Sequence, residues 1–207
     1  MSIEFDAPES VDSESQFCTE PGTYHLIIME TLEGVMPDGK TTMTGGGFSL
    51  SFSILEGTVK GQVEKTIGIP FGNPGPEATD KGRLMSSQKR CALFIATDLM
   101  QPGQLGARGL KIDVDLSKGR QVIATFERDA RPGREKYLQL SYANIYHVDD
   151  PRAATFPKSQ ESLALIPKQL RHDAKYFEPL VSKSKPASAN PAAGTRPQLN
   201  ASQLAEL

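Results

Sequence analysis

Residues 34–54 read GVMPDGKTTMTGGGFSLSFSI, and this stretch decides between two fold classes. Its first eight residues match the phosphate-binding pattern G-x-x-x-x-G-K-[ST] of nucleotide hydrolases. Such a loop holds phosphates only where a helix follows it, because the free N–H groups at the start of the helix bind them. Here three glycines follow, and each costs a helix about 1 kcal/mol relative to alanine. Phe48–Ile54 then alternates apolar residues with serine, which predicts a strand, so we interpret the stretch as a β-hairpin.

Further alternating segments place this hairpin in a mostly β domain. The predicted strands are 22–33, 47–56, 62–69, 110–116, 120–127 and 136–147. Between the third and fourth, residues 80–100 carry apolar residues at helical spacing. Three strands, one helix and two or three more strands form the element order of an OB-fold, a partly open barrel. We therefore predict an all-β protein with one helix, an OB-fold-like barrel of five or six strands, in residues 21–150.

The segments on either side of this domain differ from it in composition. Residues 1–20 carry six acids and no base, and residues 183–197 are rich in Pro, Ala and Ser. We predict an acidic N-terminal segment at 1–20, a short helical extension at 151–182, and a flexible, disordered tail at 183–207 with an apolar tip. No apolar run is long enough for a membrane helix, and the acidic N-terminus is unlike a secretory signal, which favours a cytoplasmic location without membrane contact.

Groups that could perform catalysis are scattered along the sequence. His25, His147 and His172 stand apart from one another. Asp113 and Asp115 share one face of a predicted strand, which would suit a metal, but no third acidic partner is near. Because catalysis needs clustered groups, we expect no enzyme activity, no cofactor and no metal site.

Basic and aromatic residues lie together in a way that suits a nucleic acid. Residues 81–136 hold twelve bases against six acids. Single-strand binders combine such basic grooves with aromatic faces on which bases stack. Tyr137 and Phe71 lack an apolar context and are the predicted stacking residues. The predicted nucleic-acid-binding residues are Lys60, Lys65, Phe71, Lys111, Arg120, Arg128, Arg131, Arg134, Lys136 and Tyr137.

Several short segments resemble a family of bacteriophage proteins. They are FDA at 5–7, EPGTY at 20–24, FSLSFSILEG at 48–57, RCALF at 90–94, LKIDV at 110–114 and ANIY at 143–146. The segments are similar to those of an uncharacterised OB-fold family that looks like phage single-stranded-DNA-binding proteins, over about residues 3–150. The resemblance implies a non-enzymatic protein of phage-type replication or recombination in a bacterial or phage-infected cell. It would bind single-stranded nucleic acid, with DNA favoured and little sequence preference, and a replication or recombination protein through its tail.

Two features depart from that family, and other functions stay open. Residues 119–127 look like an additional strand, and the tail lacks the dense acidic end typical of single-strand binders. The near-neutral net charge of −2 favours a protein-interaction or assembly module on the same barrel. Nucleotide hydrolysis through Gly34–Thr41 is the third alternative. A homo-oligomer is compatible with each of these functions.

If residues 34–41 form a hairpin turn, the side chain of Lys40 has no phosphate to bind. We expect the Lys40→Ala variant to fold as the wild type does, with a change in unfolding free energy of less than about 0.5 kcal/mol. Neither protein should release phosphate from ATP. ATP hydrolysis by the wild type that disappears in Lys40→Ala would show that these residues are a phosphate-binding loop.

Overall fold

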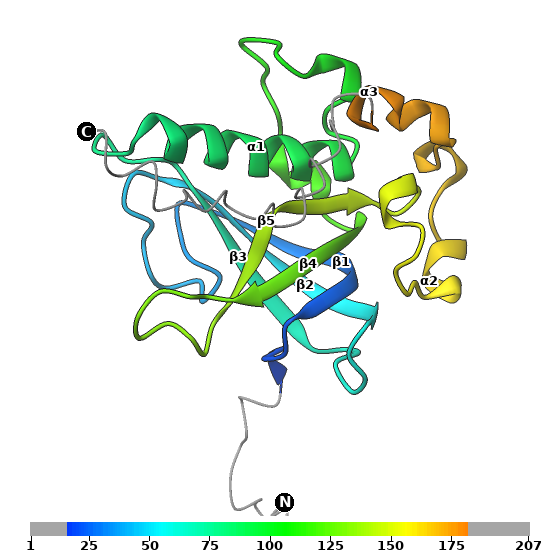
Figure 1. The fold of residues 1–207 in the computed structure, drawn as a ribbon, viewed down its shortest axis with the longest axis horizontal. Helices are drawn as coiled ribbons and strands as arrows, with labels where there is room; N and C mark the ends of the chain where they lie inside the picture. The colour runs from blue at the N-terminus through cyan, green and yellow to red at the C-terminus, as the bar shows by residue number, and fades with distance from the viewer. Residues whose placement is uncertain (1–15, 182–207) are drawn as a thin grey trace, which may run out of the picture.

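Five antiparallel strands form one curled sheet in the computed structural model, which describes residues 16–181 (Figure 1). The strands are β1 (Gly22–Glu33), β2 (Gly47–Gly57), β3 (Thr66–Gly72), β4 (Gln121–Arg128) and β5 (Leu138–His147). They lie in the order β3-β2-β1-β4-β5, so β1 pairs with both β2 and β4. The sheet curls into a half-barrel, which confirms the predicted OB-like architecture and sets the number of strands at five.

The helix α1 (Asp80–Ala96) covers the open side of this half-barrel, where it packs against β5 and β3. It begins after Thr79, whose hydroxyl accepts a hydrogen bond from the Gly82 N–H at 3.1 Å. Such a cap satisfies one of the N–H groups that a helix start leaves free. The helix ends at Thr97, and Asp98 follows in the left-handed conformation with φ of 58°. β3 and β5 are the two edges of the sheet, and α1 spans the opening between them.

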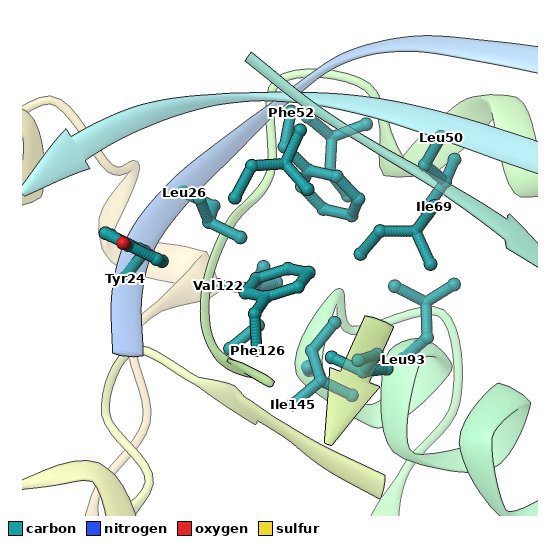
Figure 2. Close-up of a cluster of buried hydrophobic side chains, with 14 of the residues drawn as sticks. Tyr24, Leu26, Leu50, Phe52, Ile69, Leu93, Val122, Phe126 and Ile145 are labelled. Carbon is teal, nitrogen blue, oxygen red and sulfur yellow. The ribbon is translucent and has the colours of Figure 1, made fainter. Parts of the chain in front are cut away.

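The core fills the concave side of the sheet. Figure 2 shows side chains from all five strands facing Leu93 of α1. The alternation predicted for β2 is confirmed, because Leu50 and Phe52 are buried in this core. Each such side chain stabilises the fold by about 1.5–3 kcal/mol on burial. The labelled core residues are Tyr24, Leu26, Leu50, Phe52, Ile69, Leu93, Val122, Phe126 and Ile145.

The strand predicted at residues 110–116 is absent, and the fourth strand of the sheet is instead the next predicted one, near residues 120–127. Residues 110–116, all within the described part of the chain, form no strand and end in a 3-10 turn at Val114–Ser117. The carboxylate of Asp113 accepts the N–H of Asp115 at 3.1 Å, and aspartate commonly favours such local bonds over a sheet. The segment expected to be an additional strand is β4, which is paired on both sides. It is therefore a regular member of the five-stranded sheet.

The strand β3 begins and ends later than the sequence predicted. Pro70 lies within it, which is possible because β3 is an edge strand and the missing N–H faces no partner. Phe71 is consequently a strand residue, only 5% exposed, and its ring stacks on Phe48 with 5.0 Å between centroids. The prediction that Phe71 stacks on a base as an exposed ring without apolar neighbours is therefore wrong.

Residues 151–181 pack on the convex face of β1, β4 and β5 and include the short helices α2 (Gln160–Ala164) and α3 (Glu178–Val181). His25 of β1 points to this face, and its Nδ1 accepts the N–H of Ser159 at 3.1 Å. Burial there lowers the pKa of His25 to about 4. Phe177 of this extension is fully buried, so the extension is packed as part of the fold.

The outer segments of the chain lie beyond this description. The predicted tail at 183–207 and most of the predicted acidic segment at 1–20 fall outside the described residues. Between residues 16 and 181, no helix combines the length and apolar character needed to cross a membrane.

Gly47, at the start of β2, provides a test of the sheet geometry. Its φ is +119°, and an added Cβ would lie 2.5 Å from the Phe71 carbonyl oxygen. Gly106 also has a positive φ, of +91°, but nothing lies within 4 Å of its Cβ position. We expect Gly106→Ala to cost about 1–2 kcal/mol, the penalty of the left-handed conformation. Gly47→Ala should cost at least about 2 kcal/mol more in urea unfolding, because backbone must move. Equal losses would contradict the close approach of β2 and β3.

Candidate nucleic-acid interface

The β4–β5 loop, residues 129–137, carries the densest group of predicted binding residues. Gly22 at the start of β1 pairs with Phe126 near the end of β4, so this loop lies near the start of β1. The β2–β3 turn carries Lys60 and Lys65 at the same end of the sheet, because Gly57 pairs with Tyr24. Figure 1 shows the two connections on either side of the start of β1.

The buried carboxylate of Asp129 organises the β4–β5 loop. Asp129 is 2% exposed and accepts hydrogen bonds from the side chain and the backbone N–H of Arg131 at 2.5–3.1 Å. Nε of Arg134 lies 3.2 Å from the same carboxylate. The hydrogen bonds from Arg131 lower the pKa of Asp129 to about 2, and the charges of both arginines act in the same direction. Both arginines therefore shape the loop, and part of their charge is already balanced.

Tyr137 is the exposed aromatic residue of this loop, with 49% of its surface accessible. Cζ of Arg134 lies 5.5 Å from the centre of its ring, and Nζ of Lys136 lies 5.3 Å from it. A cation at such a distance is attracted to the face of the ring. Lys136 makes no ion pair with any residue between 16 and 181. An exposed ring with adjacent cations can stack a base and contact its phosphate.

The predicted binding residues are divided between two ends of the sheet and the core. Phe71 is buried, while Lys111 lies exposed in the connection between α1 and β4. Arg120 directly precedes β4, at the end opposite the β4–β5 loop, where its carbonyl accepts the N–H of Ile28 at 3.0 Å. The structure places seven of the ten at one end: Lys60, Lys65, Arg128, Arg131, Arg134, Lys136 and Tyr137.

The turn that resembles a phosphate-binding loop is closed by its own carboxylate. Asp38 accepts the hydroxyl of Thr41 at 2.6 Å and the N–H groups of Lys40 and Thr41 at 2.9 and 2.8 Å. The hydrogen bond from the Thr41 hydroxyl, followed by those from the two N–H groups, lowers the pKa of Asp38 to about 2. A phosphate would need the same N–H groups. Val35 and Thr42 form a β-bridge across the turn, and β2 follows rather than a helix. The hairpin interpretation is confirmed.

The structure also brings together three residues that are far apart in the sequence. Nε2 of His172 lies 2.7 Å from one carboxylate oxygen of Asp98, and Nε2 of His147 lies 3.4 Å from the other. The expectation that His147 and His172 are isolated is wrong. The helical spacing predicted over residues 80–100 includes Asp98, whereas α1 ends at Ala96, so the sequence carried no signal of this aspartate's position. The spacing of residues along the chain does not predict that the extension returns to the end of α1.

No protein-family model matches this chain, and no curated protein matches it either. The resemblance to phage proteins therefore rests on the short segments of sequence given above.

The pairing of Asp129 with Arg131 predicts a dependence of stability on pH. Because the folded pKa of about 2 lies below the ordinary 3.8, the ionised carboxylate stabilises the fold above about pH 4. This contribution is lost as the pH falls through about 2. Asp129→Asn should therefore be less stable than the wild type at pH 7, with a smaller difference at pH 2, in urea unfolding. Glu135→Gln, which changes the exposed acid of the same loop, is the control. A difference for Asp129→Asn that stays constant with pH would contradict the pairing.

Proposed function

We propose that this protein binds single-stranded nucleic acid, with DNA the favoured ligand, at the end of the half-barrel that carries the β4–β5 loop. The observation that carries the proposal is the exposed ring of Tyr137 with the cations of Arg134 and Lys136 within 5.5 Å of its centre. Stacking of a base on an aromatic ring contributes about 1–3 kcal/mol and depends little on the base. The proposal therefore includes low sequence preference.

The charge of the loop supports contact with phosphates. Residues 128–137 contain four bases and two acids, and both acids are engaged within the loop. Asp129 is buried against the arginines, and the carboxylate of Glu135 accepts the N–H of Gly133 at 3.0 Å. Arg128 is balanced by Glu20, whose carboxylate lies 3.4 Å from its guanidinium. The positive charge that faces solvent therefore comes from Lys136 and the exposed parts of Arg131 and Arg134. Exposed Lys60 on the β2–β3 turn extends this positive charge past the start of β1.

The β1–β2 hairpin gives a reason why the β4–β5 loop would carry the binding. OB-folds commonly bind nucleic acid across strands 2 and 3 and through the loops 1–2 and 4–5. Here the hairpin folds back onto β3. The contact is so close that a Cβ added to Gly68 of β3 would lie only 2.3 Å from Cβ of Pro37 in the hairpin. Pro37 therefore covers part of the outer face of β3. The β4–β5 loop remains as the exposed part of the usual binding surface.

The biological setting belongs to the same proposal. The resemblance to phage single-strand binders, together with the OB-like half-barrel, supports a non-enzymatic role in phage-type replication or recombination. This role would place the protein in the cytoplasm of a bacterial or phage-infected cell. The segment proposed to recruit a partner, residues 183–207, lies outside the described residues.

The proposal is tested by titrating labelled oligo-dT with the full chain at two salt concentrations. Lys136→Ala should weaken binding to all sequences and flatten the log–log salt dependence by about 0.7, because one phosphate contact is lost. Lys111→Ala, which removes an exposed lysine elsewhere, is the matched control and should bind as the wild type does. If the two lysine substitutions changed the affinity and the salt slope equally, the binding site would not be at this loop.

The aromatic contribution is separated by two substitutions of Tyr137. Tyr137→Ala should weaken binding by about 5- to 150-fold with the salt slope nearly unchanged, because stacking releases no counterions. Tyr137→Phe keeps the ring and should bind nearly as the wild type does. A wild type that binds neither oligo-dT nor single-stranded RNA would overturn the proposed function. A protein-interaction module would then be the better interpretation of the barrel.

A further inference from the structure

Asp98, His147 and His172 come from three separate parts of the fold and meet at one point. Asp98 follows α1, His147 is the last residue of β5, and His172 belongs to the extension. One ligand atom from each lies within 4.8 Å of the other two. A tetrahedral metal site with bonds of about 2.0–2.1 Å has ligand atoms about 3.3 Å apart. Nε2 of His172 lies 2.7 Å from Oδ1 of Asp98, and Nε2 of His147 lies 3.4 Å from Oδ2, so the two imidazoles face the two oxygens of one carboxylate at about this separation.

The backbone holds Asp98 in an unusual place for a carboxylate. Its φ of 58° lies in the left-handed region that glycine prefers after a helix. The N–H of Asp98 donates to Ile95 O at 3.2 Å, and the N–H of Leu99 donates to Phe94 O at 2.8 Å. A negative charge at this end of a helix is unfavourable, because the helix carbonyls point toward it. The carboxylate therefore needs cationic partners, which a metal ion with two imidazoles would supply.

The groups behind the two histidines suit metal ligands. Histidines that bind a metal usually direct their second ring nitrogen to a carboxylate or carbonyl. Nδ1 of His147 lies 3.9 Å from Oδ2 of Asp149, which also accepts the backbone N–H of His172 at 3.0 Å. The ring of His172 stacks on Tyr176 with 3.9 Å between centroids. Both imidazoles are thus held in place by neighbouring side chains.

The hydrogen on His147 would change position when a cation binds. In the structure the N–H of Asp149 points to Nδ1 of His147 at 3.1 Å, so a neutral ring carries its hydrogen on Nε2, facing Asp98. A metal at Nε2 requires the hydrogen on Nδ1 instead. Arg171 and the N–H of His172 hold Oδ2 of Asp149 at 2.8 and 3.0 Å, and this oxygen lies 3.9 Å from Nδ1. It would accept the hydrogen once the imidazole moves toward it.

A cavity of about 180 Å³ borders Asp98 and His147 on one side. Its walls include the apolar residues Leu165 and Ile166 of the extension. Arg120 also lines it, and Nη1 of Arg120 is buried with no hydrogen-bond partner among the described residues. A metal at the cluster would therefore have room for a water or a small ligand on the cavity side. The unpartnered Nη1 suits an anionic ligand there.

We propose that Asp98, His147 and His172 bind a divalent transition-metal ion of the zinc class, with one coordination position open to this cavity. Two imidazole nitrogens and one carboxylate suit such an ion better than magnesium or calcium, which favour all-oxygen sites. The metal would join α1, β5 and the extension. The site is separate from the proposed nucleic-acid site, because His147 pairs with Val122 at the opposite end of β4 from the β4–β5 loop.

Calorimetric titration of the untagged, chelator-treated full chain with Zn²⁺ tests the site. The wild type should bind one Zn²⁺ per chain. Asp98→Asn, which preserves the shape of the side chain, should weaken binding by at least about tenfold. Asp113→Asn makes the same change in an exposed acid outside the cluster and should leave binding unchanged. No binding by the wild type, or equal binding by Asp98→Asn, would overturn the proposal.

A second variant and readout separate metal binding from loss of the fold. His172 lies on the extension with 20% of its side chain exposed, so His172→Ala removes a ligand without opening the barrel core. Co²⁺ should give the wild type the intense visible absorption of a four-coordinate site, and His172→Ala should lack it. Zn²⁺ should raise the melting temperature of the wild type but not that of His172→Ala, because only a folded site binds the ion. Equal absorption or equal stabilisation in both proteins would contradict the assignment.

Discussion

The double pairing of the central strand β1 is the constraint on which the rest of the structure depends. β1 pairs with β2 along nearly its whole length and with β4 through Gly22–Ile27. The register between β1 and β2 shifts twice, between His25 and Leu26 and between Ile28 and Glu30. Such irregularities increase the twist of a sheet, so the five strands curl. Because they curl, the single helix α1 can cover the open side, and the ends of β1 determine where the loops lie.

Much of this fold could be predicted from the sequence, because its long strands alternate cleanly. The predictions that were wrong concern segments whose alternating pattern did not match their structure. Residues 110–116 alternate as a strand does, but Asp113 forms a local turn and no neighbouring strand pairs with them. Tyr142 lies in the alternating segment 136–147, in which it would share the buried face with Leu138 and Leu140. It is instead 46% exposed with φ of 47°, because β5 is irregular opposite β4 at this point. An irregular register between two strands cannot be predicted from the sequence of one strand alone.

The candidate sites show the same distinction between local and long-range information. The β4–β5 loop could be predicted because Arg128 to Tyr137 are neighbours in the sequence. The role of Asp129 in holding two arginines depends on its burial, which the sequence does not show. The Asp98–His147–His172 cluster was missed because its members meet only through the packing of α1 on β5 and the return of the extension to the end of α1. A site formed by neighbouring residues could therefore be predicted from the sequence, whereas a site formed by residues far apart in the sequence could not.

We propose that single-stranded nucleic acid binds at the end of the half-barrel formed by the β4–β5 loop and the β2–β3 turn. The most direct test is an amide chemical-shift titration of the ¹⁵N-labelled full chain with unlabelled oligo-dT. The account predicts the largest changes in residues 128–138 and 58–65, with the amides around Asp98 and His147 unchanged. Changes centred on the cavity beside His147 or on the hairpin at 34–46, or no changes at a saturating concentration, would contradict it.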